Sequence, residues 1–316
     1  MTKAEKDQLE KYKQSNKARK LVLLARMGFK TQEKYFESMG VSKKAPAKVA
    51  KKAVKVTATT SDSKPTDYVV AFDCTDSMAG YIGAVKEHVV DLVKKLFTNS
   101  PDLRMKIVAF GDYCDMEGTT KFGKAYQTIE LTNDQNALIK FVQTSQNTSG
   151  GDSDEFYELV IRKINRETSW RKDAAKAVLL IGDAYCHSLH YRGLPQGAIN
   201  TIDWRKEAEE AKSLGIQYDT LLIDPAIQWY GELSKITGGV SMIFQNAAKV
   251  DSIIEGAIYA RSSPKAFYAA SCSAMSSGDS ELIGAYKSLS TLSDALTGTT
   301  TTTSTKLTGT LTDKDK

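Results

Sequence analysis

Acidic and hydroxyl side chains gather at three points where this sequence passes from an apolar run into a loop. They are Asp73, Thr75 and Ser77 after the run 68–72, Asp152 in the loop 148–155, and Asp183 after the run 177–181. Carboxylates and hydroxyls are hard oxygen donors, the ligands that Mg²⁺ and Ca²⁺ prefer. If the fold brings the three loops together, they predict a site for a divalent cation.

Alternating strands and helices are expected to position these loops. Short uninterrupted apolar runs are typical of strands buried on both faces of a parallel sheet, and apolar residues at helical spacing follow most of them. Expected strands cover 68–72, 105–110, 124–131, 177–181, 217–223 and 240–244, and expected helices cover 78–97, 134–145, 153–166, 203–214, 226–236 and 247–260. The alternation predicts a doubly wound α/β fold with a mostly parallel sheet. Ligands of such folds bind at the carboxyl ends of the strands, where the three acidic loops would meet.

The three loops resemble the metal-ion-dependent adhesion site of the von Willebrand factor A family. The first family motif, D-x-S/T-x-S, matches Asp73, Thr75 and Ser77, the glycine-rich second loop matches at Asp152, and the Asp after the fourth strand matches Asp183. The segments FDCTDSM, SGGDSDE and GDAYCH are most similar to A domains that accompany alpha-kinases and to bacterial and phage A domains. The resemblance implies the family's Rossmann-like fold over residues 67–261. It also implies a Mg²⁺ site, with Ca²⁺ or Mn²⁺ as alternatives.

Further polar residues are expected at the rim of this site or behind its ligands. Asp76 stands where relatives usually have Gly, Ser153 follows Asp152, Asp112 follows the second strand, and His187 follows Asp183. The resemblance implies that the bound cation bridges to a protein partner, whose acidic side chain would complete the metal shell.

Charge divides the chain into two unlike parts. The net charge is +5, but residues 1–64 hold fifteen lysines and two arginines against six acids, a net charge of +11, which leaves −6 for the rest. Residues 1–40 are expected to form a basic helical arm, and residues 41–66 a linker rich in Lys, Ala and Thr. Residues 262–316 are rich in Ser and Thr and are expected to be a largely disordered tail with a weak helix at 281–296.

Composition and motifs narrow the classes of function. The chain has no run of about 18 apolar residues and its charged start lacks an apolar signal segment, so we expect an intracellular, cytoplasmic protein without a membrane span. Metal-assisted hydrolysis at the acidic edge is one alternative to protein binding and would use His187 as its base. Because no phosphate loop or nucleophile elbow occurs, we favour binding over catalysis. The other alternative is nucleic-acid binding through residues 1–64, which would neutralise phosphates.

Overall fold

The computed structural model describes residues 64–118 and 121–297, so the basic arm, most of the linker and the end of the tail lie outside the described residues. Its main feature is a six-stranded sheet in the order β3-β2-β1-β5-β7-β8. Five strands are parallel: β1 (Thr66–Asp73), β2 (Leu103–Phe110), β5 (Ala175–Gly182), β7 (Ile216–Leu222) and β8 (Ser241–Ile243). The edge strand β3 (Tyr126–Thr132) is antiparallel to β2. The predicted α/β fold with a mostly parallel sheet is confirmed.

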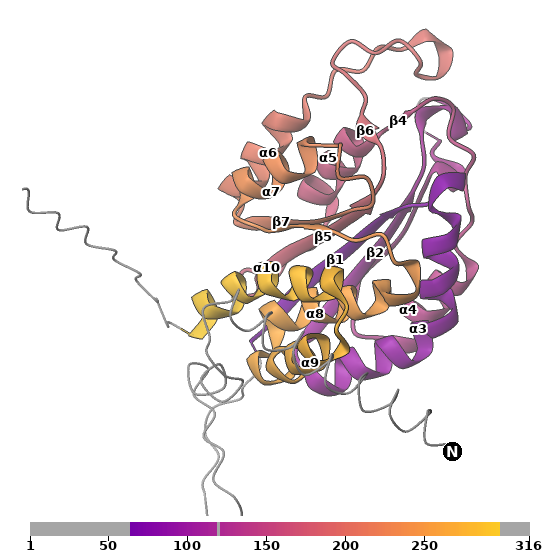
Figure 1. The fold of residues 1–316 in the computed structure, drawn as a ribbon. Coiled ribbons are helices and arrows are strands. Elements are labelled where there is room, and N and C mark those ends of the chain that lie inside the picture. The colour runs from indigo at the N-terminus through magenta and orange to yellow at the C-terminus, as the bar shows by residue number, and fades with distance from the viewer. Residues whose placement is uncertain (1–63, 119–120, 298–316) are drawn as a thin grey trace, which may run out of the picture. The chain divides into compact units, whose positions relative to one another are not determined.

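Helices cover both faces of the sheet (Figure 1). One face packs against α3 (Ala79–Asn99), α4 (Gln135–Thr144) and α8 (Val250–Ser262), and the other against α5 (Tyr157–Glu167), α6 (Trp204–Ser213) and α7 (Trp229–Thr237). Successive side chains of a strand point to opposite faces, so Val69 joins the core under α5 and Val70 joins the core under α3. This is why the apolar runs of the central strands are uninterrupted.

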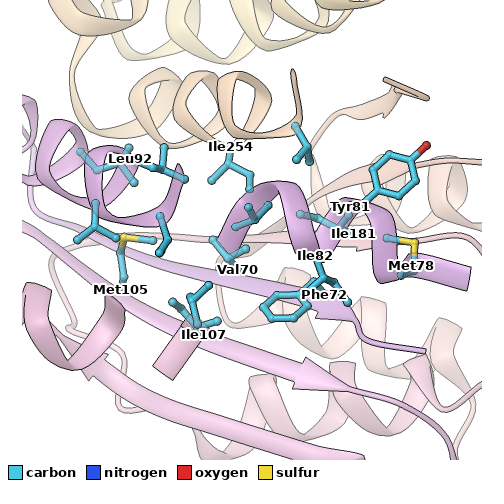
Figure 2. Close-up of a pocket in the computed structure, with 16 residues that line it drawn as sticks. Val70, Phe72, Met78, Tyr81, Ile82, Leu92, Met105, Ile107, Ile181 and Ile254 are labelled. Carbon is cyan, nitrogen blue, oxygen red and sulfur yellow. The ribbon is translucent and has the colours of Figure 1, made fainter. Parts of the chain in front are cut away.

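The core under α3 contains a small apolar cavity. Its volume is about 50 Å³, and side chains of β1, β2, β5, α3 and α8 surround it. Figure 2 shows Val70, Ile82, Met105 and Ile254 among the residues that line it. The lining consists of aliphatic, aromatic and methionine side chains, and its one hydroxyl, that of Tyr81, donates to the carbonyl of Gln245. A cavity with so few polar partners offers no good place for a water molecule.

The C-terminal region differs from the sequence-based expectation of a largely disordered tail. Two helices follow α8, namely α9 (Pro264–Ser277) and α10 (Ser280–Thr297), of which only the second was predicted. Ser263 accepts a hydrogen bond from the amide of Ala266, and Pro264 occupies the first helical turn. These are strong start signals for a helix. Leu289 and Tyr286 of α10 are buried, so this part of the tail belongs to the core.

Two short strands hold the second and third acidic loops together. β4 (Asp154–Glu155) pairs in parallel with β6 (Tyr185–Cys186), outside the main sheet. The sequence pattern predicts a helix from residue 153, but α5 starts at Tyr157 because the preceding residues form this pairing. The pairing fixes the loop after β5 against the loop before α5.

Candidate metal centre

Four side chains form a connected series at the carboxyl end of the sheet. Asp73 ends β1, and its Oδ1 accepts hydrogen bonds from the amide and the hydroxyl of Thr75, at 2.9 and 2.7 Å. The hydroxyl oxygens of Thr75 and Ser77 lie 3.2 Å apart. Ser77 in turn donates to Oδ1 of Asp183 at 3.2 Å. Asp183 follows β5, the neighbour of β1, so the first and third predicted loops meet as expected from the sheet topology.

Asp73 is buried at the bottom of this series, and Ser77 is exposed at its top. The second carboxylate oxygen of Asp73 accepts a hydrogen bond from the hydroxyl of Tyr157 at 2.7 Å. The chain passes close to that hydroxyl at Gly182, where a Cβ atom would lie only 2.0 Å from it. The start of α5 and the end of β5 together therefore fix the orientation of the Asp73 carboxylate.

Burial disfavours the charged forms of these carboxylates. It raises the pKa of Asp73 to about 6, although the hydrogen bonds from Thr75 and Tyr157 act in the opposite direction. Burial also raises the pKa of Asp183, against the hydrogen bond from Ser77. A nearby positive charge would reverse both shifts, because it favours the ionised carboxylates.

Glu155 is a further acidic residue of this region that the sequence pattern did not reveal. Its side chain is buried, and Oε2 has no hydrogen-bond partner. A Cβ atom at Gly150 would lie 2.9 Å from Glu155 Oε1 and 3.4 Å from the methyl carbon of Thr75, and the backbone φ of +67° there favours glycine. Burial, followed by the charge of Asp73, raises the pKa of Glu155 to about 10. The pattern SGGDSDE offers three acids in four positions, and only the β4 pairing decides which one turns inward.

Asp152 lies with two of the expected rim residues, and its expected place beside Asp73 stays a prediction. Donor atoms of Asp112, Asp152 and His187 lie within 4.8 Å of one another. Among the described residues, no hydrogen bond joins Asp152 to Asp73, Thr75, Ser77 or Asp183; its oxygens accept from Tyr191 and from the amide of Asp154.

The remaining predicted rim residues, Asp76 and Ser153, are exposed to solvent. His187 is only 1% exposed, and its Nε2 lies 2.5 Å from Asp112 Oδ1. A base this enclosed is poorly placed to reach a substrate, so the geometry lends no support to the hydrolytic alternative.

The donor set fits a divalent cation. It combines two carboxylates with two hydroxyls on adjacent loops, which are ligands for hard cations such as Mg²⁺. The unpartnered Oε2 of Glu155 is also explained more easily if a positive charge lies near it, because buried polar atoms without partners are rare and costly.

A comparison with protein families shows which family this chain belongs to. The sequence profile of the von Willebrand factor type A domain matches residues 67–252, more than half of the chain. The chain belongs to this family. The matched von Willebrand factor A domain contains all the acidic residues of the site, whereas α9 and α10 lie beyond its end.

Solved structures that are similar to this chain include two proteins of low sequence identity. The pilus adhesin SpaC from Lactobacillus rhamnosus GG is 15% identical, with a TM-score of 0.46, over 62% of this chain and 30% of its own. Proximal thread matrix protein 1 from the mussel byssus is 16% identical, with a TM-score of 0.44, over 60% of this chain and 46% of its own. This chain thus spans less than half the length of either structure. No curated protein matches it by sequence.

Family membership points to a role in protein–protein interaction or adhesion. Within the part of the chain that the structure describes, no helix is both long and apolar enough to cross a membrane.

Proposed function

We propose that this von Willebrand factor A domain binds a protein partner through a divalent cation held by Asp73, Thr75, Ser77 and Asp183. The observation that carries the proposal is the series of close oxygen contacts from buried Asp73 through Thr75 to exposed Ser77 and Asp183. Such an arrangement anchors one end of a donor set rigidly and opens the other end to solvent. Mg²⁺ is the cation that this all-oxygen set suits best, with Ca²⁺ or Mn²⁺ as substitutes.

Each residue has a distinct role in this proposal. Asp73 and Asp183 supply negative charge, and the hydroxyls of Thr75 and Ser77 supply neutral oxygens. When bound, the cation would attract a carboxylate of the partner, because Mg²⁺ usually keeps several water molecules that a ligand can replace. Tyr157 and Thr75 hold Asp73 in place before any ligand arrives, so little ordering is needed on binding.

The first test of the proposal is the response of thermal unfolding to Mg²⁺. A cation that binds only the folded state raises the melting temperature as its concentration rises. Asp183→Asn should abolish most of this rise, because it removes a charge at the half-buried end of the series. Asp173→Asn is the matched control, since Asp173 is exposed in the turn before β5, at the other end of that strand.

Partner binding is tested separately with the full chain as bait. Proteins retained with Mg²⁺ and released with EDTA should be lost from Asp183→Asn and kept by Asp173→Asn. If Mg²⁺ changes the melting temperatures of the wild type and of Asp183→Asn by the same amount, the proposed cation site is contradicted. If the melting response is present but EDTA releases no partner, the site binds metal without a bridging role.

A further inference from the structure

A second cluster of metal-ligating side chains lies beside the site described above. Asp112 follows β2, Asp152 precedes β4 and His187 follows β6, and each places a donor atom within 4.8 Å of the other two. Among the described residues, no hydrogen bond joins this trio to Asp73 or Ser77, although the same loops carry both groups.

The trio is held in place from several directions. Asp112 is buried and caps the short 3-10 helix Tyr113–Asp115 through a reciprocal capping box with Asp115. The ring of Tyr191 stacks on His187 with 3.8 Å between centroids, and its hydroxyl donates to Oδ2 of Asp152 at 2.8 Å. One tyrosine therefore positions two members of the trio at once.

Backbone pairing brings the same loops together. The amide of His187 donates to the carbonyl of Glu155 at 3.3 Å, which extends the β4–β6 ladder by one bond. A Cβ atom at Gly151 would lie 2.8 Å from the sulfur of Cys114 and 3.7 Å from Asp112 Oδ2, so the second loop passes close beside Asp112. The positions of all three donors are thus set by the fold and do not depend on long, free side chains.

Within the trio itself, one buried ring nitrogen has no hydrogen-bond partner, namely Nδ1 of His187, a residue that is 1% exposed. Glu155 is 4% exposed, and its Oε2 has no hydrogen-bond partner. The charges of Asp112 and Asp152 both act on this carboxyl group, together with that of Asp73. Buried polar atoms without partners are rare and costly, so both observations favour a ligand near these acidic loops.

We propose that Asp112, Asp152 and His187 form a second metal site, selective for a borderline dication such as Zn²⁺ over Mg²⁺. Two carboxylates and one imidazole make a three-donor protein set of the kind that Zn²⁺ accepts together with water. Imidazole favours Zn²⁺ and its neighbours in the transition series, whereas Mg²⁺ prefers oxygen donors alone. The first site contains no nitrogen donor, so the two sites differ in the ion that they prefer.

Binding of the metal through Nε2 of His187 requires that this nitrogen carry no proton. Nε2 of His187 and Oδ1 of Asp112 now share one hydrogen bond, and both are candidate donor atoms. On a neutral ring the proton moves to Nδ1, which has no hydrogen-bond partner, and the metal takes its place at Nε2. On a charged ring one proton is released to solvent as the metal binds.

The test is calorimetric titration of Zn²⁺ into the full chain with millimolar Mg²⁺ present throughout, so that the first site is occupied by Mg²⁺. We expect one equivalent of Zn²⁺ to bind. His187→Gln and Asp152→Asn should each weaken it by at least about ten-fold, as losses around metal sites commonly do. Asp152 is exposed, so its variant tests the site even if the buried His187 variant fails to fold.

Two matched controls define the outcome. His88→Gln changes an exposed histidine of α3, and Asp183→Asn changes the first site, so both should retain Zn²⁺ binding. Absorption of Co²⁺, used as a spectroscopic substitute, should show visible bands that disappear in His187→Gln. Equal Zn²⁺ affinity in the wild type, Asp152→Asn and His187→Gln would overturn the proposal. Loss of Zn²⁺ binding in Asp183→Asn alone would overturn it as well, because the ion would then occupy the first site.

Discussion

The hydroxyl of Tyr157 donates to Oδ2 of Asp73 at 2.7 Å, across 84 positions of sequence. Oδ1 of the same carboxylate is occupied by Thr75, so both oxygens of Asp73 have fixed partners. Tyr157 is the first residue of α5, the helix that follows the second acidic loop. The opening residue of the metal motif is therefore oriented by an element outside that motif.

Tyr157→Phe removes this hydroxyl while it keeps the ring, which is fully buried. Loss of a hydrogen bond to a charged or partly charged buried group should reduce the free energy of unfolding by about 1–3 kcal/mol. The rise of melting temperature with Mg²⁺ should also shrink, because Asp73 loses its fixed orientation. Both quantities are measured by thermal unfolding with and without Mg²⁺.

Tyr218→Phe is the matched control for that variant. Tyr218 is equally buried and donates to Asn165 at 3.0 Å, away from the acidic loops. It should lose a similar amount of stability and keep the full Mg²⁺ response. If the two variants respond alike to Mg²⁺, Tyr157 has no special role at the cation site.

Gly182→Ala should damage the site through sterics alone. The new methyl group would lie 2.0 Å from the Tyr157 hydroxyl and 2.7 Å from that of Tyr230, so at least one ring must move. Overpacking of this kind costs about 1–3 kcal/mol of folding free energy and should weaken the Mg²⁺ response with it. Gly231→Ala in α7 has open space around its Cβ and should be neutral or stabilising by up to about 1 kcal/mol. A Gly182→Ala protein with an unchanged Mg²⁺ response would contradict the proposed link between Gly182, Tyr157 and Asp73.

The sequence is sufficient to predict the sheet, its flanking helices and the meeting of Asp73 with Asp183. These features follow from local apolar patterns and from the rule that the carboxyl ends of parallel strands share one edge. Local apolar patterns do not predict the inward turn of Glu155 or the grouping of Asp152 with His187. They depend on the two-residue pairing between β4 and β6, which has no periodic signal in so short a segment.

The helix α9 was missed for a related reason. Its sequence is rich in Ala and Ser, and such composition gives little amphipathic pattern. Its place in the fold depends on close approach of neighbouring helices. For example, the ring of Phe267 in α9 stacks on that of Tyr286 in α10, with 5.8 Å between the ring centroids. Contacts of this kind become visible only once the helices are placed.

The cavity under α3 predicts that adjacent valines of β1 respond differently to enlargement. Val70 lines the cavity of about 50 Å³ shown in Figure 2, whereas Val69 packs in the opposite core. Val70→Ile adds one methylene toward unfilled space and should stabilise the protein by up to about 0.8 kcal/mol. Val69→Ile adds the same group to a filled core and should destabilise it by about 1–3 kcal/mol. Urea unfolding of the two variants gives both values, and equal destabilisation would show that the cavity cannot accept the methylene.

Glu158 should make the stability of the protein depend on pH. The residue is buried in α5, Oε1 accepts a hydrogen bond from Tyr113 at 2.7 Å, and Oε2 has no partner. Burial raises the pKa of Glu158 from the ordinary value of 4.5 to about 8. Between these two values the folded protein holds a proton that the unfolded chain has released.

The contribution of Glu158 to stability must therefore fall as pH rises through this window and level off above about 8, with a slope of at most about 1.4 kcal/mol per pH unit. The raised pKa values of Asp73 and Glu155 add slopes of the same sign to the whole profile. Glu158→Gln mimics the protonated acid and should flatten this part of the profile, so its advantage over the wild type grows from pH 5 to pH 8. Glu209→Gln, an exposed change on α6, should leave the profile as it is. Urea unfolding in EDTA at a series of pH values measures all three proteins without interference from bound metal. Parallel profiles for the wild type and Glu158→Gln would mean that Glu158 is already ionised at neutral pH in the folded protein.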